Sequence, residues 1–547
     1  MPVLKIKILP STEKCFLDDK IDSKKAVFHL SMLRNERLSF QTAYTAENLG
    51  KSTCKRCEMT VSGELADRIS AYKIENVPVT VASYPWTEDA DYLRREPGLY
   101  PDLLRPVDLS IPVAVSENLN AYLFTVEDEN GIAPGEYEIT VSMTLDGVTV
   151  SETLKITVVD SMLPEQELIH TEWFHVDCIA NYYGCEVYSE RHFELIEQYM
   201  KAAVRCGVNM ILTPIVTPPL DTGVGYERLT TQLVDIELND GVYSYSYEKL
   251  DRYVDIAKRC GIRYFEMSHL FAQWGGEGTA KVMATVDGEY KRIFGWGTDI
   301  WGEEFGKFVH SFLTSLTAHL RELGIADCCY FHISDEPHLE HLELYTKAKE
   351  LVASELEGFP LMDALSDYDF YETGAVHTPV PAIDRIEPFI EHKVPDLWGY
   401  FCCGQHTDVP NRFMAMPGRR TRILSTQLFK YGIKGFLQWG FNFWNSQYSH
   451  FALNPYTDVC GDSWVPAGDA FAVYPGNDGK PIYSLHALHF FEALQDLRAL
   501  RLLERKIGYD GVMKLIEEDC DSPITFKNYP RNDEYIMNLR QKINSLL

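Results

Sequence analysis

The 547-residue chain lacks any run of 18 or more apolar residues, so no membrane-spanning helix is expected. Its first ten residues show no basic segment followed by an apolar core and a cleavage site, and no secretory signal is predicted. Basic residues are few. There are 51 Lys and Arg against 80 Asp and Glu, and the net charge of −29 argues against nucleic acid as a partner. A glycine-rich phosphate loop before a helix is also missing, which argues against nucleotide chemistry.

Cysteine is present but follows no disulfide pattern. The thirteen cysteines are odd in number and scattered, with adjacent pairs at Cys328-Cys329 and Cys402-Cys403 inside apolar runs. Such placement is typical of buried free thiols in a reducing compartment. The Cys-x-x-Cys at Cys54 and Cys57 has no partner pair, so no zinc or redox site is predicted. We therefore expect a cytoplasmic protein.

Residues 1–160 are predicted to form an all-β sandwich, because short strand-like runs recur there at regular spacing. Residues 26–33 and 38–44 flank a polar turn at 34–37. Residues 135–143 and 148–159 are joined across Asp146-Gly147, a dipeptide typical of two-residue hairpin turns.

From about residue 165, strand-like runs alternate with amphipathic helices, the pattern of a (β/α)8 TIM-type barrel. The predicted strands cover residues 169–174, 208–213, 263–267, 328–333, 360–363, 376–380, 396–401 and 435–439. The predicted helices include residues 193–204, 247–257, 312–323 and 339–356, and the first two stop before Gly207 and Gly261. We therefore divide the chain into a sandwich at 1–160, a catalytic barrel at 161–506 and a C-terminal tail at 507–547 packed on the barrel.

Asp335 and Glu336 are the main candidates for catalysis. They end the run Tyr330-Phe-His-Ile-Ser-Asp-Glu-Pro337, in which Pro337 stops the strand. The carboxyl ends of barrel strands carry active sites. Glycoside cleavage needs a proton donor and a group that stabilises an oxocarbenium-like centre. Two neighbouring acids in a desolvated pocket cannot both ionise freely, so we expect Glu336 to act as the acid beside a charged Asp335.

The adjacency of the two acids limits the possible mechanisms. Consecutive strand residues point to opposite faces, so both acids can serve one site only if the strand has ended or bulged. The usual retaining pair, facing each other across the anomeric carbon from separate strands, does not fit adjacent residues. Attack by the substrate's own 2-acetamido group does fit. The structural alternative is a helix start, with Ser334 or Asp335 as N-cap.

Eight further residues are candidates for substrate binding, each with a structural alternative. Trp439 at a strand end and Trp444 in the following loop have aromatic faces suited to the apolar face of a pyranose, but both could also be core residues. Tyr400 could donate a hydrogen bond to an acetamido carbonyl, and Asp221 could hold a sugar hydroxyl or order its turn. The remaining candidates follow strands or lie in long loops: His175, His269, Trp274 and Asp469.

Histidines near the two acids are candidate metal ligands. His332, His338 and His341 are close in sequence, and the last two would share one helical face. No Asp or Glu completes a known metal pattern with them, so neither a metal nor another cofactor is predicted.

Several motifs follow one another through the second region. They are His170-Thr-Glu-Trp-Phe-His-Val-Asp177, Leu212-Thr-Pro-Ile-Val-Thr-Pro-Pro-Leu-Asp-Thr222, Ser268-His-Leu-Phe-Ala-Gln-Trp274, Ile333-Ser-Asp-Glu-Pro337, Trp398-Gly-Tyr-Phe-Cys-Cys403, Gly435-Phe-Leu-Gln-Trp439 and Gly468-Asp-Ala-Phe-Ala-Val-Tyr-Pro475. With these motifs the chain resembles glycoside hydrolase family 123 and the wider DUF4091 proteins around it. The β-rich first region fits the N-terminal sandwich that such proteins carry.

The resemblance implies a retaining exo-β-N-acetylgalactosaminidase that uses substrate-assisted catalysis. The family's Asp-Glu pair maps onto Asp335, which would hold the acetamido group, and Glu336, which would be the general acid and then the base. One departure follows the Tyr-Pro motif, where the usual Ser-Ile-Arg run is replaced by Ser484-Leu-His-Ala-Leu-His489. Whatever that arginine does in the family is either absent from this chain or performed by another residue.

The expected function is a β-N-acetylgalactosaminidase, or a close β-N-acetylhexosaminidase, acting on a glycan or glycoside with a terminal β-linked N-acetylhexosamine. Two alternatives stay open. One is an ordinary two-carboxylate retaining glycosidase on a non-acetamido sugar, with Glu336 as acid/base and Glu172 or Glu266 as nucleophile. The other is a non-catalytic carbohydrate-binding barrel. The sugar epimer and the oligomeric state are left undetermined by the sequence.

Overall fold

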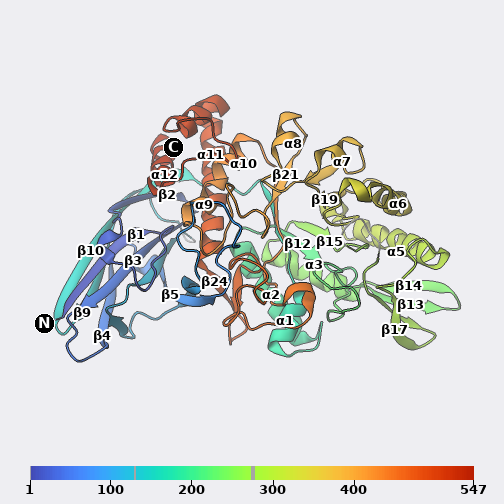
Figure 1. Ribbon diagram of the computed structural model, residues 1–547, viewed down its shortest axis with the longest axis horizontal. Coiled ribbons are helices and arrows are strands. Elements are labelled where there is room, and N and C mark those ends of the chain that lie inside the picture. Colours follow the sequence, from blue (N-terminus) through green and yellow to red (C-terminus); the bar gives the residue numbers. More distant parts are fainter. Residues whose placement is uncertain (1, 129–130, 273–277) are drawn as a thin grey trace.

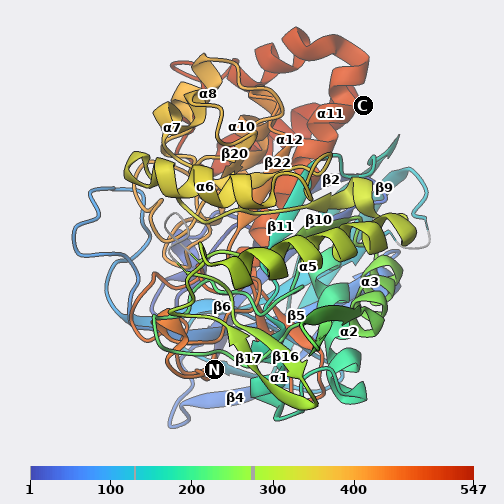
Figure 2. The same ribbon diagram turned by 90° about the vertical axis from the view of Figure 1, so that its right-hand side faces the viewer.

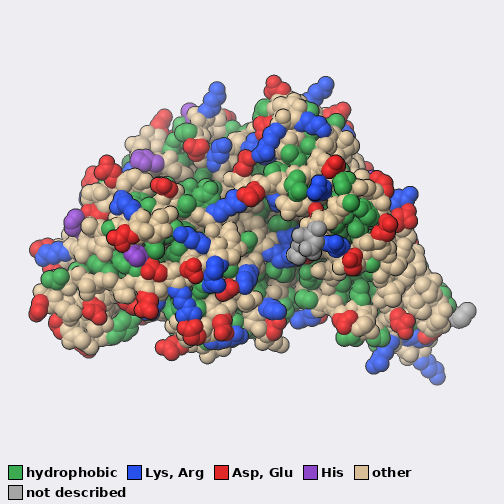
Figure 3. All heavy atoms as spheres, turned by 180° about the vertical axis from the view of Figure 1, so that it is seen from behind, with side chains coloured by type: hydrophobic (Ala, Val, Ile, Leu, Met, Phe, Trp, Pro, Cys, Tyr) green, Lys and Arg blue, Asp and Glu red, His purple; other side chains and the backbone are tan. Residues whose placement is uncertain are grey.

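The computed structural model of the protein describes residues 2–128, 131–272 and 278–547. In Figure 1 the strands of the N-terminal region (blue to cyan) lie at one end of the molecule, and the region of parallel strands lies toward the other. The long helix α11 (Leu485–Glu517, red) stands between them. On the face seen in Figure 3, basic side chains are interspersed with acidic ones. Among the described residues, no helix combines the length and the apolar composition needed to cross a bilayer.

The N-terminal region consists of two β-sheets packed face to face, as its recurring short strands predicted. Its strands are β1 (Val3–Pro10), β2 (His29–Arg34), β3 (Arg37–Glu47), β4 (Cys54–Gly63), β5 (Ile69–Val79), β6 (Gly98–Pro106), β7 (Val113–Ser116), β8 (Asn120–Glu127), β9 (Gly135–Leu145) and β10 (Val148–Met162). One sheet has the order β1-β3-β8-β5-β6-β24-β23 and the other β2-β10-β9-β4-β7. Both sheets contribute to one core that includes Phe40, Phe124, Ile139 and Ile156.

The turn between β9 and β10 is the hairpin predicted at Asp146-Gly147. These two residues have φ angles of 51° and 81°, and Leu145 pairs with Val148 across them. Two successive left-handed residues are what a type I′ turn requires, and Asp-Gly adopts them at low cost. The hairpin prediction is therefore confirmed.

The seven-stranded sheet is completed by strands from far along the chain. β23 (Val473–Pro475) and β24 (Pro481–Ser484) form a hairpin, and β24 pairs with β6 through Tyr483–Leu104 and Ser484–Leu103. α11 starts directly after β24, and its N-cap Ser484 accepts a hydrogen bond from the backbone N–H of Ala487. This pairing, which the sequence patterns did not indicate, joins the two regions through a shared hydrogen-bonded sheet.

The second region contains eight parallel strands at the predicted places. They are β11 (Ile169–Glu172), β12 (Met210–Thr213), β15 (Tyr264–Met267), β18 (Cys329–Tyr330), β19 (Met362–Ala364), β20 (Thr378–Val380), β21 (Trp398–Tyr400) and β22 (Gly435–Gln438). Six of them form a sheet in the order β18-β15-β12-β11-β22-β21, while β19 and β20 form a separate pair. Isolated parallel bridges link Phe331 to Leu361 and Ala382 to Tyr400. The prediction of a (β/α)8 barrel is confirmed in part, since the parallel strands form two ladders rather than one continuous sheet.

Helices follow the strands, as the alternating pattern predicted. They are α1 (Val176–Tyr183), α2 (Glu190–Arg205), α3 (Glu248–Cys260), α5 (Glu303–Glu322), α6 (Leu342–Val352), α7 (Tyr368–Glu372), α8 (Glu387–Glu391), α9 (Gly418–Arg422) and α10 (Leu424–Lys430). α3 ends at Gly261, whose φ of 104° forms a left-handed cap that a side chain would strain. Figure 2 shows α5 and α6 on the side of the molecule away from the sandwich.

A small four-stranded sheet is inserted among these elements and was not predicted. It has the order β14-β13-β16-β17 and consists of β13 (Asp235–Asn239), β14 (Val242–Ser246), β16 (Val282–Val286) and β17 (Glu289–Phe294). β14 does alternate, with Tyr243 and Tyr245 half-buried between exposed residues, whereas β17 is mostly exposed and lacks the alternation that marks a half-buried strand.

Residues 507–547 contact both regions. α11 is interrupted by a kink at Gly508, whose φ of 74° is not helical, and is followed by α12 (Asp533–Leu546). Arg540 on α12 forms ion pairs with Glu36 between β2 and β3 (2.6 Å) and with Asp496 on α11 (2.7 Å). The C-terminal helix therefore connects α11 to the sandwich.

Candidate active site

Asp335 and Glu336 lie beyond the end of a parallel strand. β18 ends at Tyr330, and the next regular element is a 3-10 helix at Leu339–His341. Asp335 is buried, at 7% exposure, and Glu336 is half-buried. Glu336 has a φ of 45°, a left-handed conformation that is strained for a residue with a side chain and that clusters at functional sites. Because neither residue belongs to a strand, their side chains are not forced to opposite faces of a sheet.

The alternative of a helix cap at the two acids is not what the structure shows. The 3-10 helix begins after Pro337, with His338 as its N-cap, and the backbone N–H of His338 donates to Nδ1 of His341 at 3.1 Å. The two histidines that suggested a metal therefore cap a helix start. Neither Ser334 nor Asp335 is the N-cap of this helix.

Tyr400, the last residue of β21, contacts the pair of acids. Its hydroxyl donates a 2.6 Å hydrogen bond to Oε1 of Glu336. Hydrogen bonds to carboxylates are stronger than neutral ones and orient the acceptor. The sequence predicted that Tyr400 binds substrate, and in the structure its hydroxyl orients Glu336.

Asp221 and Asp469 bring further carboxylates from two other loops. Oδ2 of Asp221 is buried and has no hydrogen-bond partner among the described residues. Burial raises the pKa of Asp221 to about 6, with Arg228 opposing the rise and the carboxylate of Glu336 adding to it. Burial also raises the pKa of Asp469 to about 7, against the hydrogen bond from Trp439, and Asp221 contributes to this rise. These mutual effects place Asp221 within electrostatic reach of both Glu336 and Asp469.

Trp439 follows β22 directly and orients Asp469. Its indole N–H donates to Oδ2 of Asp469 at 2.9 Å, and Nε2 of Gln438 donates to the backbone carbonyl of Asp469 at 2.7 Å. The ring of Trp439 is 8% exposed and packs against Trp464, with centroids 5.5 Å apart. The end of β22 thus fixes a carboxylate and an aromatic face together.

His332 lies between two buried carboxylates next to the catalytic pair. Its Nε2 is 2.7 Å from Oε1 of Glu266, and its Nδ1 is 3.3 Å from Oδ1 of Asp363. Burial opposes the charge, but these two hydrogen bonds raise the pKa of His332 to about 10, so the ring is an imidazolium. Oδ1 of Asp363 also accepts the backbone N–H of Ile333 at 3.1 Å. The network is therefore tied to the segment that carries the two catalytic candidates.

His269 stacks on His332, with ring centroids 4.0 Å apart. Burial and the charge of His332 hold the pKa of His269 well below its usual range, and neither of its ring nitrogens has a partner among the described residues. The ligand atoms of His269, His332 and Asp363 lie within 4.8 Å of one another, the spacing of a metal site. The neutral His269 is free to bind a hydroxyl group.

The comparisons with known proteins agree with a carboxylate-lined site of this kind. Residues 173–503, more than half of the chain, match the family model described as the catalytic domain of glycoside hydrolase 123. The chain belongs to glycoside hydrolase family 123. The matched range of this family 123 enzyme starts just after β11 and ends within α11, so it includes Asp221, Asp335, Glu336 and Asp469.

The fold of this family 123 enzyme is shared by a solved structure. A family 123 glycoside hydrolase from Clostridium perfringens, studied for glycolipid glycan hydrolysis, has a TM-score of 0.74 and 14% identity, covering 99% of this chain and 97% of its own. A β-glucuronidase from Parabacteroides merdae is 9% identical, and the alignment covers 90% of this chain and 51% of its own. Its TM-score of 0.30 is too low to indicate a shared fold. The search of the curated proteins found no match.

Two of the predicted substrate-binding residues have structural roles in this family 123 enzyme. Nε2 of His175 bonds the carbonyl of Trp439 at 3.1 Å, and Arg228 donates to its Nδ1 at 2.9 Å. Burial and the charge of Arg228 lower the pKa of His175 to about 3. Trp444 is 2% exposed and its indole N–H donates to the carbonyl of Val473 at 3.3 Å. Both lie in the core, which agrees with the structural alternative that was kept for each of them.

The other candidates divide between the site and the part of the chain that is not described. Trp274 lies outside the described residues. Four candidates are linked to Glu336 or to each other by hydrogen bonds or charge effects, and they are Asp221, Tyr400, Trp439 and Asp469. His269 instead contacts His332.

Tyr84, from the sandwich region, reaches the site and was missed by the sequence reasoning. It lies in the loop between β5 and β6, and its hydroxyl donates to the carbonyl of Trp464 at 3.2 Å. Burial raises the pKa of Tyr84, and Cys403 and Asp469 add to the rise. Its sequence context, Tyr84-Pro-Trp86, carries no signal that would have linked it to residues almost 400 positions later.

His486 takes the third position of the segment that departs from the family pattern. Its Nδ1 bonds Oδ1 of Asp102 on β6 at 2.7 Å, and its Nε2 bonds the carbonyl of Phe471 at 2.8 Å. Tyr474 also donates to Asp102, at 2.6 Å. In this enzyme the histidine therefore connects α11 to the sandwich.

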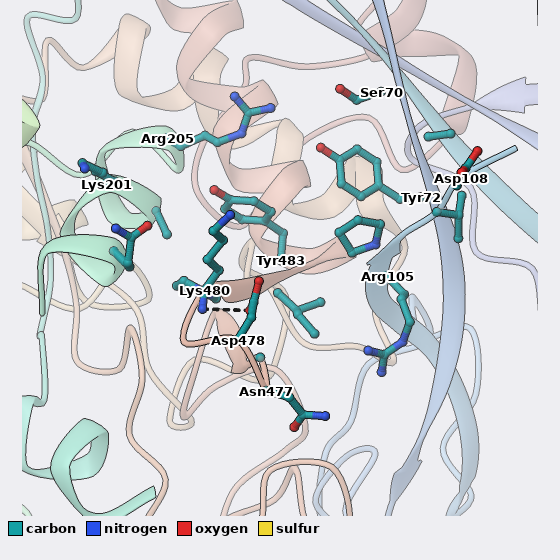
Figure 4. Close-up of a pocket in the computed structure, with 18 of the residues that line it drawn as sticks. Ser70, Tyr72, Arg105, Asp108, Lys201, Arg205, Asn477, Asp478, Lys480 and Tyr483 are labelled. Atoms are coloured by element: carbon teal, nitrogen blue, oxygen red, sulfur yellow. Dashed lines mark hydrogen bonds between the residues drawn. The ribbon is translucent and has the colours of Figure 1, made fainter. Parts of the chain in front are cut away.

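A groove of about 1010 Å³ lies apart from the catalytic candidates, between the sandwich and α2. Figure 4 shows Lys201 and Arg205 of α2 on one side and Tyr72 and Arg105 of the sandwich on the other, with Lys480 between them. None of the catalytic candidates contributes to its lining. Volume alone therefore does not identify the active site in this enzyme.

Proposed function

We propose that this family 123 glycoside hydrolase is an exo-acting, retaining β-N-acetylgalactosaminidase, or a close β-N-acetylhexosaminidase, that uses substrate-assisted catalysis. The observation that carries the proposal is the placement of the acids. Asp335 and Glu336 share one irregular segment, and Tyr400 binds Glu336. The acids of the neighbouring strands are held in hydrogen bonds and ion pairs with other buried side chains.

Those internal pairs argue against an enzymic nucleophile. Glu266 is fully buried and accepts hydrogen bonds from Thr171 (2.5 Å), Trp173 (2.8 Å) and His332 (2.7 Å). Glu172 is 2.9 Å from the guanidinium of Arg412, which is itself buried. A nucleophile needs an unblocked oxygen facing the anomeric carbon about 5 Å from the acid. Neither glutamate has one, so the ordinary two-carboxylate mechanism is the less supported alternative.

In the proposed reaction Glu336 gives its proton to the glycosidic oxygen while that bond to the anomeric carbon breaks. The carbonyl oxygen of the 2-acetamido group bonds to the anomeric carbon and forms an oxazolinium ring. Asp335 accepts the amide N–H and stabilises the positive charge that develops there. Glu336 then removes a proton from water, which attacks the anomeric carbon, opens the ring and restores the acetamido group with retained configuration.

The other residues of the site would bind the terminal sugar. Asp221, Asp469 and His269 have atoms that can hydrogen-bond hydroxyl groups, and Trp439 offers an aromatic face. Raised pKa values of Asp221 and Asp469 allow either carboxyl to donate or accept near neutral pH. The proposed substrate is a glycan or glycoside with a terminal β-linked N-acetylhexosamine.

The finer structural predictions belong to the same proposal. We propose that the two parallel ladders act as one (β/α)8-type barrel closed through the bridges at Phe331 and Ala382. The division at residues 160 and 506 is kept as the domain organisation. All thirteen cysteines are free thiols, which supports the predicted cytoplasmic location.

The experiment is the release of p-nitrophenol from β-GalNAc, β-GlcNAc and β-galactose glycosides. Wild type, Asp335→Asn and Glu336→Gln are compared, with Asp478→Asn in the distant groove as a matched control. The proposal expects cleavage of one or both acetamido sugars, a fall in kcat of about 10²- to 10⁴-fold in each catalytic variant, and no change in the control. Cleavage of the galactoside alone would refute the substrate-assisted mechanism.

A further inference from the structure

A cluster of exposed rings lies on two loops beside Asp221. Val224 is 77% exposed, Tyr226 50%, Tyr448 38% and Phe451 52%, and His450 is also exposed. Large apolar side chains are normally scattered singly on a protein surface, and a group of them marks an interaction site. The two loops follow β12 and β22, whose carboxyl ends border the catalytic residues.

The two loops are fastened to each other. The backbone N–H of Gly223 donates to the carbonyl of Tyr448 at 2.9 Å, and Oγ of Ser449 donates to the carbonyl of Asp221 at 2.6 Å. The rings of Tyr226 and His450 are stacked, with centroids 4.1 Å apart and an interplanar angle of 30°. A Cβ atom at Gly223 would lie 3.2 Å from both Nε2 of His450 and Cβ of Tyr448, so a side chain there would be tightly packed against the second loop.

The backbone of these loops is strained at three positions. Asp221, Tyr448 and Ser449 have φ angles of 52°, 57° and 55°, all in the left-handed region that residues with side chains seldom adopt. Such strain persists only where the surroundings enforce it, and it concentrates at ligand sites. Here it holds the rings of Tyr226 and His450 beside an aspartate whose Oδ2 atom has no partner among the described residues.

The position of the two loops relative to the glycosidic bond follows from the position of Asp221. The second loop follows β22, which pairs with β21, and Tyr400 at the end of β21 donates to Glu336, the general acid candidate. The charge of Glu336 also raises the pKa of Asp221, in agreement with this position. The placement of the substrate rings rests on the proposed exo-acting function. An exo-acting enzyme holds the terminal sugar among the buried acids, and every other ring of the substrate lies on the leaving-group side, toward solvent. Exposed rings at the border of the site are therefore placed for the leaving group.

We propose that Tyr226 and His450, with Tyr448 and Phe451 beside them, form an aromatic platform for the pyranose ring of the leaving group. The apolar C–H face of that ring packs on the stacked pair. The unpaired Oδ2 of Asp221 accepts a hydrogen bond from a hydroxyl near the glycosidic bond. The platform makes the enzyme prefer glycan substrates over glycosides with small leaving groups.

The test compares two substrates whose leaving groups are both alkyl alcohols. One is the methyl β-glycoside of N-acetylgalactosamine, and the other is the same sugar β-linked to galactose. Tyr226→Ala is expected to lower kcat/KM for the disaccharide by about tenfold and to change that for the methyl glycoside by less than twofold. Tyr226→Phe keeps the ring and should behave as wild type. Tyr290→Ala removes a tyrosine with 62% exposure from β17 and is the matched control.

Each outcome is decisive. An equal loss on both substrates would show that Tyr226 only supports Asp221, and it would overturn the platform. No loss on either substrate would overturn it as well. If wild type cleaves neither substrate nor the same pair built on N-acetylglucosamine, the proposed function fails and the platform with it. If wild type cleaves both substrates equally well, the function stands and the platform fails.

Discussion

The acids of the parallel-strand region form two groups with different surroundings. Glu172 and Glu266 end or lie on strands, and Asp363 lies on β19. Each of the three contacts a cation or several donors, as with the imidazolium of His332 between Glu266 and Asp363. Asp221, Glu336 and Asp469 lie in the loops that follow the strands. Their side chains have few donors, and one oxygen of Asp221 has none among the described residues.

This difference separates structural acids from chemically available ones. A buried carboxylate that is held by a cation or by several donors stabilises its neighbours only while the pairs are intact, and fewer of its lone pairs are left for a substrate. A buried carboxyl with few partners exchanges protons nearer neutral pH, and such groups cluster at active sites. Acids on the parallel strands therefore stabilise the fold, whereas acids in the loops after those strands are the candidates for the reaction.

Glu266→Gln is the strongest challenge to the comparison. The change leaves the imidazolium of His332 with one carboxylate instead of two in a fully buried position. Removing one partner of a buried ion pair costs about 3–5 kcal/mol, so the free energy of unfolding should fall by about that amount in denaturant titrations. Asp335→Asn, in the segment that follows β18, should change it by less than about 1 kcal/mol. A fully stable but inactive Glu266→Gln enzyme would make Glu266 a nucleophile and erase the distinction.

Asp469→Asn tests the acids of the loops through the dependence of stability on pH. The folded-state pKa of Asp469 is about 7, well above the usual value of 3.8. The unfolded chain therefore releases this proton first, and the carboxyl destabilises the fold progressively as pH rises from about 4 to about 7. Asparagine does not titrate, so the variant should gain stability relative to wild type over this range, by at most about 4 kcal/mol. Unfolding free energies measured between pH 5 and pH 8 check this. Curves that stay parallel would show that Asp469 is not held protonated.

Two tyrosines provide a matched pair across the two groups. Tyr400 donates to Glu336 at 2.6 Å and Tyr345 donates to Asp363 at 2.5 Å, and both hydroxyls are buried. A hydrogen bond to a charged group is worth about 1.5–3 kcal/mol. Tyr400→Phe should therefore lower kcat by about 10- to 100-fold with little change in stability. Tyr345→Phe should lower stability by about 1.5–3 kcal/mol with little change in kcat. The reverse pattern would contradict the assignment of the two groups.

Most regular elements could be predicted from the sequence, because their signals are local. The strands are marked by apolar runs, α3 by its amphipathic period and Gly261, and the β9–β10 hairpin by Asp146-Gly147. The pairing of β24 with β6 joins residues almost 400 positions apart, and no local pattern encodes such a contact. The same holds for Tyr84, whose side chain reaches the site across two regions.

The candidate site shows the same limit at single residues. Trp439 and Trp444 belong to one aromatic run, yet one binds Asp469 and the other the carbonyl of Val473 in the core. Which of them faces the site depends on where β22 ends and how the next loop turns. His175 resembled a ligand residue because nothing nearby in the sequence indicates Arg228, which occupies its Nδ1.

The central claim is that the substrate's acetamido group, rather than a protein carboxylate, attacks the anomeric carbon. The most direct measurement is kcat/KM for aryl β-glycosides in which this acetamido group carries none, one, two or three fluorine atoms. Fluorine withdraws electrons and weakens the carbonyl oxygen as a nucleophile. The account predicts a steep, monotonic fall in kcat/KM along the series. A rate that does not depend on fluorination would contradict it and would return the search for a nucleophile to Glu172 and Glu266.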